Sequence, residues 1–258
     1  MDKLVFMTGA SSGIGQALAW RYYQAGWRLA LAARRTTEIE SWARAQVLNP
    51  ARYAIYGADV TDTDSIVAAG QACLAGQGLP DVVIASAGIS AGVDTSQRED
   101  IDVIKDIYAT NNVGMAATFH PFVAPMVQRR SGTFVGIASV AGIRGLPGHG
   151  AYGASKAAVM MYCESLRGEM RPFGVKVVTI SPGYIATPLT AHDRFSMPFK
   201  MQAPQFADRA FAAIEAGVSY RVIPWQMAVA AKILRLLPDA LFDRLMANRP
   251  RKQRRTQH

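Results

Sequence analysis

The stretch MTGASSGIG, Met7 to Gly15, decides the fold. It follows a short apolar run and precedes a helical pattern, so its glycines fall between a strand and a helix. Glycines there let the backbone turn sharply and let a phosphate approach the helix N-terminus, where free N–H groups and the helix dipole favour negative charge. A glycine-rich turn alone occurs in many loops. In this strand–turn–helix setting, we interpret it as a dinucleotide-binding turn.

The rest of the chain continues the alternation of apolar runs and helical patterns. Apolar, β-branched runs predict strands at residues 3–8, 27–34, 52–60, 80–88, 132–139, 175–183 and 220–225. Helical patterns separate them, at residues 13–26, 65–78, 100–130 and from 151 to about 172. Such alternation is typical of a parallel sheet covered by helices on both faces. The sequence therefore predicts one doubly wound α/β Rossmann domain over residues 1–248, with a central parallel sheet of about seven strands.

The composition agrees with one large domain. The chain has 258 residues, of which 50% are hydrophobic, enough for a substantial core. Cys73 and Cys163 are far apart and lack metal-ligand spacing, so we expect neither a disulfide framework nor a metal site. The sequence shows no signal-peptide pattern and no apolar run long enough to span a bilayer. We therefore expect a soluble, cytoplasmic protein.

Positive charge is concentrated at the end of the chain. The formal net charge is +9, and five of these charges come from residues 249–258, RPRKQRRTQH, which contain no acid. We expect this basic tail to be disordered and solvated. The alternative is a peripheral membrane contact through the tail and the amphipathic helical pattern that begins near residue 224. No nucleic-acid-binding motif is present, so we expect no nucleic-acid partner.

A second stretch, YGASK, carries the candidate chemistry. On the helix predicted from about Ala151, Tyr152 and Lys156 lie on one face, about 6 Å apart along the axis. An ammonium beside a phenol lowers the phenol's pKa from about 10, which suits a proton donor near neutral pH. The alternative is a tyrosine that merely packs on a lysine side chain.

The glycine turn together with Tyr-x-x-x-Lys resembles the short-chain dehydrogenase/reductases of the single-domain type, from Lys3 to about Pro188. TGASSGIG is similar to the family's cofactor loop, and YGASK to its catalytic motif. GIASVAG puts Ser139 at the family's catalytic serine, and NNVG puts Asn111 at its asparagine. SPGYIATP resembles the stretch that caps the nicotinamide, and ADVTD offers two residues for the adenine edge.

This resemblance implies specific roles. Tyr152 would be the general acid/base, and Lys156 would lower its pKa and bind the nicotinamide ribose. Ser139 would hold the substrate oxygen, and Asn111 would order a water that passes protons to the lysine. Besides Tyr152 and Lys156, the implied cofactor-binding residues are Gly9, Ser11, Ser12, Gly13, Ile14, Gly15, Arg34, Arg35, Asp59, Val60, Ala87, Gly88, Pro182, Gly183, Ile185 and Thr187.

The end of the second predicted strand favours the phosphorylated cofactor. In dinucleotide folds, an acid about 20 residues past the glycine turn binds the ribose 2′-OH of NAD. That position here holds Ala33, Arg34 and Arg35, without an acid. Two guanidinium groups suit a 2′-phosphate, so we predict NADP(H) rather than NAD(H), the alternative being a solvated arginine pair. One departure from the family pattern, Ala85 and Ser86 in place of two asparagines, concerns the cofactor wall rather than catalysis.

The substrate side is less specific. Residues 188–216 resemble the family's mobile lid and carry four apolar side chains, at Phe195, Met197, Phe199 and Met201. Adaptable apolar side chains there predict an apolar substrate, although this face could instead pack on the body. His149 could face the substrate, but an ordinary loop histidine is the better interpretation.

The sequence thus predicts an NADPH-dependent oxidoreductase that interconverts a carbonyl and a secondary alcohol by hydride transfer. The protein would supply geometry, a proton and electrostatics, while the cofactor carries the hydride. The alternative is a catalytically silent NADP(H)-binding sensor or scaffold. The resemblance also implies a small-molecule partner and a homodimer or homotetramer. The same catalytic residues serve many carbonyl compounds, so the sequence does not name the substrate.

Overall fold

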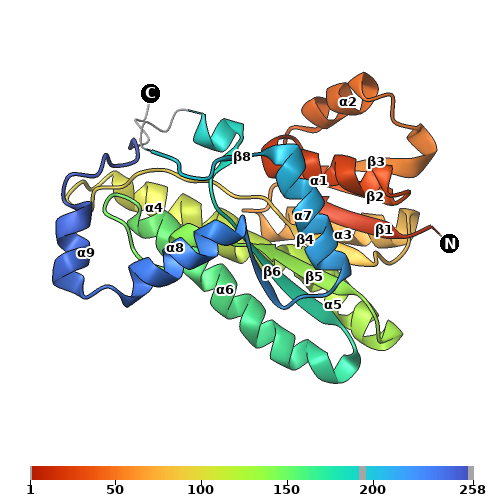
Figure 1. The fold of residues 1–258 in the computed structure, drawn as a ribbon. Helices are drawn as coiled ribbons and strands as arrows, with labels where there is room; N and C mark the ends of the chain where they lie inside the picture. The colour runs from red at the N-terminus through yellow and green to blue at the C-terminus, as the bar shows by residue number, and fades with distance from the viewer. Residues whose placement is uncertain (1, 192–195, 255–258) are drawn as a thin grey trace.

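A seven-stranded sheet forms the centre of the computed structural model, which describes residues 2–191 and 196–254 (Figure 1). The strand order is β3-β2-β1-β4-β5-β6-β9, and every neighbouring pair is parallel. This confirms the predicted doubly wound α/β fold. The strands are β1 (Leu4–Thr8), β2 (Arg28–Ala33), β3 (Tyr53–Gly57), β4 (Val82–Ala85), β5 (Thr133–Ile137), β6 (Lys176–Pro182) and β9 (Tyr220–Ile223). A separate short pair is formed by β7 (Ile185–Ala186) and β8 (Met201–Gln202).

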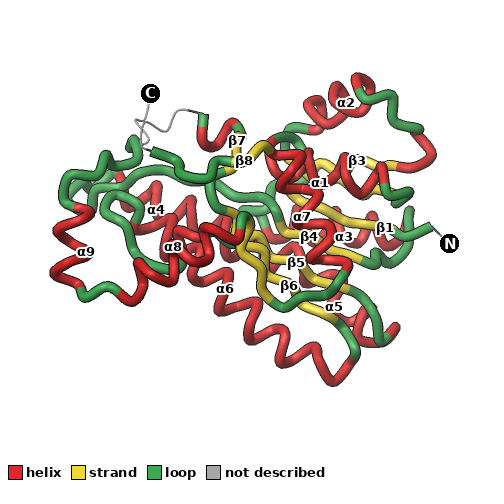
Figure 2. The backbone as a smooth tube through the Cα atoms, in the orientation of Figure 1, coloured by secondary structure: helices red, strands yellow, loops and turns green. Residues whose placement is uncertain are grey.

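Helices cover both faces of the sheet (Figure 2). One face packs against α1 (Gly13–Gln24), α2 (Thr36–Ala45) and α7 (Ala203–Glu215). The other packs against α3 (Thr63–Gly76), α5 (Gly114–Arg129) and α6 (Gly150–Met170). At the left of Figure 1 lie α4 (Asp100–Tyr108), α8 (Trp225–Leu236) and α9 (Asp239–Met246). Short helical turns are η1 (Pro50–Arg52), η2 (Ala109–Val113), η3 (Val140–Gly142), η4 (Arg171–Phe173) and η5 (Pro188–Thr190).

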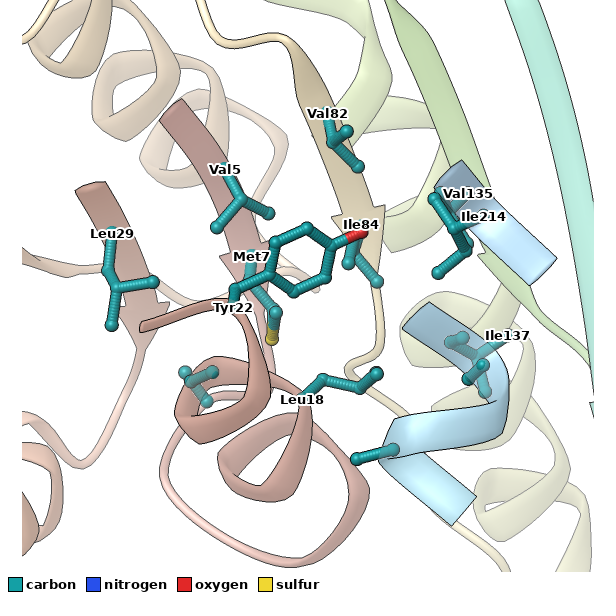
Figure 3. Packing of buried hydrophobic residues seen from close by; sticks show 14 of the residues in the cluster. Val5, Met7, Leu18, Tyr22, Leu29, Val82, Ile84, Val135, Ile137 and Ile214 are labelled. Atoms are coloured by element: carbon teal, nitrogen blue, oxygen red, sulfur yellow. The ribbon is translucent and has the colours of Figure 1, made fainter. Parts of the chain in front are cut away.

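Burial on both faces explains the unbroken apolar sequence of the central strands. In β1, Val5 and Met7 belong to the core on the α1 side, whereas Leu4 and Phe6 belong to the core on the opposite side. Successive strand residues point to opposite faces, so each of the two helical layers receives alternate side chains. Figure 3 shows the first layer, with Leu18 of α1 lying over the side chains of the sheet.

The direction of chain winding reverses between β1 and β4. Strands β2 and β3 lie on one side of β1, and β4, β5, β6 and β9 follow on the other. The connections that leave the carboxyl ends of β1 and β4 therefore run to opposite faces of the sheet, and a crevice opens between them. The glycine turn after β1 lies at this crevice.

The helix predicted over residues 100–130 is interrupted. α4 ends at Tyr108, a π turn spans Ala109–Val113, and α5 begins at Gly114. A Cβ at Gly114 would lie 2.7 Å from the backbone oxygen of Val60, so only glycine allows this close approach. Such π turns often occur at functional sites.

The second part of the segment predicted as a lid, residues 188–216, is a helix of the body. α7 occupies the second part and packs on α1, with Phe206 fully buried in the core. Met201 is also buried there, Phe199 is exposed, and Phe195 lies outside the described residues. The helix α7 thus belongs to the body, and a lid formed by the residues before it stays a prediction.

The basic tail expected to be disordered is seated on the body over its described part. The Arg254 guanidinium donates hydrogen bonds to the Asp100 carboxylate at 2.7 and 3.1 Å. The Gly92 N–H donates to the backbone oxygen of Gln253 at 2.9 Å. Residues 255–258 lie outside the described residues. The charge run alone did not reveal the distant acid that holds it.

Two expectations from composition bear on the described chain. No described helix combines the length and the apolar character that crossing a bilayer requires. Cys73 and Cys163 are both buried, and neither forms a disulfide.

Leu18 offers a test of the packing between α1 and the sheet. Its side chain is fully buried, so Leu18→Ala should lower the free energy of unfolding by about 2–5 kcal/mol, through lost apolar burial and the cavity left behind. Leu236→Ala is the matched control, because Leu236 is 83% exposed and should change stability by less than about 0.5 kcal/mol. Chemical denaturation followed by circular dichroism measures both. Equal effects of the two substitutions would contradict the packing described.

Candidate active site

The glycine turn forms a cradle at the start of α1. Gly9 and Gly13 have positive φ angles of 70° and 58°. A Cβ at Gly9 would lie 2.7 Å from the backbone nitrogen of Ala87, and a Cβ at Gly15 would collide with the carbonyl oxygen of Gly9. The first turn of α1 carries no acidic residue, and Ser12 makes no side-chain cap. Free N–H groups and the helix dipole therefore suit a bound phosphate.

A cavity of about 460 Å³ extends from this cradle along the carboxyl edge of the sheet. Every residue predicted to bind the cofactor lines it. It is also lined by residues that the sequence did not single out, among them Thr61, Ile89, Thr110 and Ala138. Their only sequence signal is a position just after a predicted strand or inside a predicted helix. The volume and the glycine-lined end fit an extended dinucleotide.

One corner of this cavity is rich in positive charge. Arg34 Nη1 lies 3.6 Å from Asp59 Oδ2, and its side chain is 66% exposed. Arg35 Nη2 donates to the hydroxyl oxygens of Ser11 at 3.3 Å and Ser12 at 3.4 Å. Burial opposes ionisation of Asp59, but hydrogen bonds from Thr61 and the charge of Arg34 prevail, so the pKa of Asp59 is lowered. The guanidinium of Arg34 thus faces a carboxylate and that of Arg35 faces two serine hydroxyls, so the corner keeps surplus positive charge and can accept a further anionic group.

Tyr152 and Lys156 lie one turn apart near the start of α6. Lys156 Nζ is 5.8 Å from the centre of the Tyr152 ring and donates to the backbone oxygen of Ile137 at 2.8 Å. The lysine is only 6% exposed. Burial disfavours its ammonium form and lowers the pKa of Lys156 to about 8.

Asn111 lies in the π turn and connects three segments. Its Nδ2 donates to the backbone oxygen of Ile89 at 3.0 Å and to Ser155 Oγ at 2.9 Å, and its Oδ1 accepts from the Ile89 N–H at 2.9 Å. Ser155 Oγ in turn donates to the backbone oxygen of Tyr152 at 2.8 Å. A Cβ at Gly88 would lie 3.3 Å from Asn111 Oδ1, so glycine keeps this place open. Asn111 thereby fixes the start of α6 relative to α4 and the loop after β4.

Ser139 follows β5 and begins η3. Its Oγ accepts a hydrogen bond from the Ala141 N–H at 3.2 Å, which orients the side chain. Ser139 and Tyr152 line both the 460 Å³ cavity and a second, smaller one. The hydroxyl groups of a serine and a tyrosine therefore lie at the junction of the two cavities.

The second cavity, of about 110 Å³, is largely apolar. Its apolar lining consists of Val140, Ala141, Ile143, Leu146, Leu189, Met227, Ala231 and Leu234, and His149 also lines it. Met197, Phe199 and Met201, the described residues on which the expectation of an apolar substrate rested, are absent from this lining. The apolar surface comes instead from η3, the loop after it, η5 and the buried face of α8.

Comparisons with known proteins agree with this arrangement. Residues 3–196 match the family model described as short chain dehydrogenase. The chain is 36% identical over 246 residues to an uncharacterized oxidoreductase of Myxococcus xanthus, covering 93% of this chain and 95% of that protein. It is 34% identical over 277 residues to the bovine dehydrogenase/reductase SDR family member 7B, covering 100% of this chain and 84% of that protein.

The chain therefore belongs to the short-chain dehydrogenase/reductases. It is an oxidoreductase of this family. A solved short-chain dehydrogenase from Streptomyces avermitilis has the same fold, with a TM-score of 0.78 at 24% identity, covering 96% of this chain and 95% of that one. One from Burkholderia cenocepacia, in complex with NADP, has a TM-score of 0.81 at 21% identity, covering 95% of this chain and 98% of that one.

The buried lysine should make stability depend on pH. Between pH of about 8 and the usual lysine pKa of about 10.4, the unfolded chain holds a proton on Lys156 that the folded chain has released. The contribution of this group therefore becomes more favourable as pH rises through that window, by at most about 1.4 kcal/mol per pH unit.

Replacing Lys156 by methionine removes this contribution. The stability of the wild type relative to Lys156→Met, measured by denaturation without cofactor, should rise between pH 8 and pH 10. Lys232→Met, at an exposed lysine of α8, is the control and should show no such trend. A difference that stays flat with pH would show that Lys156 is not perturbed by burial.

Proposed function

We propose that this protein is an NADP(H)-dependent carbonyl reductase that also works in reverse as a secondary-alcohol dehydrogenase. The observation that carries the proposal is that Ser139 and Tyr152 line both the dinucleotide-sized cavity and the apolar cavity beside it. A carbonyl group in the smaller cavity would have its oxygen near these hydroxyl groups and its carbon toward the larger cavity. The apolar lining of the smaller cavity supports an apolar substrate.

The residues that line the larger cavity would hold NADPH, which would supply the hydride for the carbonyl carbon. The carbonyl oxygen gains negative charge as the hydride arrives and takes a proton from the Tyr152 hydroxyl. Ser139 would donate a hydrogen bond to the same oxygen. The Ala141 N–H donates to Ser139 Oγ and so orients the hydroxyl group. Donors placed where charge develops stabilise the transition state.

Lys156 would favour loss of the Tyr152 proton through its positive charge and would return a proton afterwards. Its pKa of about 8 places proton uptake and release near working pH. Asn111 would keep Tyr152 and Lys156 in place through Ser155 and the loop after β4. The water-ordering role of Asn111 stays a prediction.

The preference for NADP(H) over NAD(H) rests on Arg34 and Arg35. Both line the large cavity at the end of β2, where an NAD-specific site would present an acid. The Burkholderia cenocepacia neighbour and a second fold neighbour, ElxO, were solved with NADP bound, which supports this choice. Proteins of the family use NAD(H) or NADP(H).

The second candidate function is a catalytically silent NADP(H)-binding sensor or scaffold. Its cavities would be the same, but proton transfer would not be needed. Asn111, Ser139, Tyr152 and Lys156 are all in place, which favours catalysis, because a silent protein gains nothing from a hydroxyl at the junction of the two cavities. NADPH binding without oxidation by any member of a broad carbonyl panel would favour the silent alternative.

Family members generally form oligomers and act on small molecules. We propose a homodimer or homotetramer, because apolar side chains are exposed on two neighbouring elements. Val113 of the π turn is 55% exposed, and Met161 of α6 is 67% exposed. A peripheral membrane contact through α8 and the basic tail stays a prediction, as does a cytoplasmic location. Trp225 and Ile233 on α8 are 65% and 57% exposed, which either an oligomer or a membrane would cover.

Tyr152→Phe tests the proposed proton donor. The variant should fold and bind NADPH, and its rate of carbonyl reduction should fall by at least about 10²–10⁴-fold, the usual value of general acid catalysis. Lys156→Ala should lose activity and cofactor affinity together. Tyr162→Phe, on the exposed side of α6, is the control and should keep wild-type rates. NADPH oxidation by Tyr152→Phe within a few-fold of wild type would end this mechanism.

Arg34→Glu tests the cofactor preference. A lost charge-assisted hydrogen bond costs about 1.5–3 kcal/mol, so NADPH affinity should fall by about 10–100-fold while NADH affinity is spared. Arg44→Glu, at an exposed position of α2, makes the same charge change outside the cavity and should leave both affinities unchanged. Fluorescence titration with the two cofactors gives the result. Equal wild-type affinities for NADPH and NADH would refute the preference.

A further inference from the structure

The described end of the chain, Arg249 to Arg254, crosses the substrate side of the molecule, and we call it the C-terminal strap. Arg249 and Lys252 of the strap line the 110 Å³ cavity together with Ser139 and Tyr152. The segment therefore borders the space in which a carbonyl substrate would react. The strap begins at Arg249, far along the chain from Tyr152. It nevertheless borders the same cavity as Tyr152.

Two glycines form a seat for the strap. The Gly92 N–H donates to the Gln253 backbone oxygen at 2.9 Å, and Gly92 forms a parallel β-bridge with Arg254. A Cβ at Gly92 would collide with the backbone oxygen of Lys252. A Cβ at Gly148, whose φ is 75°, would lie 2.9 Å from the Cβ of Arg251. The body thus leaves space, at two separate loops, for the backbone of this segment.

A buried carboxylate anchors the end of the strap. Arg254 Nε and Nη2 donate to the two oxygens of Asp100 at 2.7 and 3.1 Å, and Nη2 also donates to Glu99 at 3.0 Å. The Asp100 side chain is only 1% exposed and also accepts from the Asp94 N–H at 2.6 Å. These hydrogen bonds, that of Arg254 first, hold the pKa of Asp100 below its usual value. Arg254 covers this carboxylate with two charge-assisted hydrogen bonds, and such bonds favour a seated strap.

The start of the strap is held at the loop after β6. Arg249 Nη2 donates to the Tyr184 hydroxyl at 2.8 Å, and Tyr184 follows Gly183, which lines both cavities. The strap is therefore attached at both ends, to the loop after β6 and to the start of α4. Between these attachments it forms one side of the smaller cavity.

We infer that the C-terminal strap determines which substrates this site accepts, and that Arg254 is the positioning residue that keeps it closed. The inference rests on the proposed carbonyl reductase function. With the strap seated, the smaller cavity measures about 110 Å³, far below the 300–1,000 Å³ of drug-sized sites. The closed site thus suits small apolar aldehydes and ketones, and bulky ones require the strap to leave its seat.

The test compares a small and a bulky ketone, butane-2,3-dione and 2-acetylnaphthalene, with NADPH. Arg254→Gln should raise the ratio of kcat/KM for the bulky ketone over the small one by about 10-fold or more, mainly through a lower KM for the bulky ketone. Arg254→Lys keeps the charge and should restore part of the wild-type ratio. Arg98→Gln, which removes an exposed ion pair with Asp102 beside the same helix, is the control and should keep it. An unchanged ratio in Arg254→Gln would overturn the inference.

A second variant reaches the strap from the other side. Gly92→Ala should push the strap off its seat by collision with the Lys252 backbone oxygen, without altering any charge. It should therefore shift the substrate ratio in the same direction as Arg254→Gln. Opposite shifts in the two variants would also overturn the inference, because both substitutions should release the strap from its seat.

Two readouts do not depend on turnover. Trypsin cleavage after Arg251 and Lys252 should be at least about 10-fold faster in Arg254→Gln and Gly92→Ala than in wild type and Arg98→Gln. With NADP⁺ present, 2-acetylnaphthalene should raise the Tm of the two strap variants but not that of wild type. If no ketone is reduced by any protein, the proposed function fails while these readouts still decide the role of the strap. Equal cleavage rates, or a Tm shift that is equal in all proteins, would overturn it.

Discussion

The hydrogen bond from the buried Lys156 ammonium to the Ile137 backbone oxygen is the interaction on which the rest of the site depends. It joins the start of α6 to the carboxyl end of β5, which is also where Ser139 begins η3. Lys156 is almost removed from water, and burying an unpaired ammonium would cost free energy. The bond to Ile137 gives the ammonium a hydrogen-bond partner. Tyr152, one turn earlier, takes its place between the two cavities as a result.

Much of the fold could be predicted because its causes are local. Strands such as β1 are buried on both faces, so their sequences are apolar without interruption, and helices with turns between them follow in order. The break between α4 and α5 could not be predicted, because a π turn has no propensity signature and both flanks favour a helix. The close approach of Gly114 to Val60, which accompanies the break, is a contact between segments distant in sequence.

In the candidate site too, local motifs could be predicted and contacts between distant segments could not. The residues predicted to bind the cofactor form short motifs, most of them at strand ends, and all of them line the large cavity. The substrate side is assembled by long-range packing: Met201 is buried in the core and Phe199 is exposed, so neither forms the apolar surface of the smaller cavity. α8 supplies that surface instead, through Met227, Ala231 and Leu234. The basic tail was misjudged for a related reason, since a charge run does not reveal a buried acid such as Asp100.

The two cavities share only a few lining residues, among them Ser139 and Tyr152, and this separation has an evolutionary consequence. The larger cavity is lined by segments at the carboxyl ends of β1 to β6 and by the start of α6, whereas α8 and the C-terminal strap border the smaller cavity alone. Mutations in α8 or the strap can therefore accumulate without disturbing the cradle at Gly9 or the cationic corner. A lineage with this architecture can diversify the compounds on which it acts while its dinucleotide site is inherited unchanged.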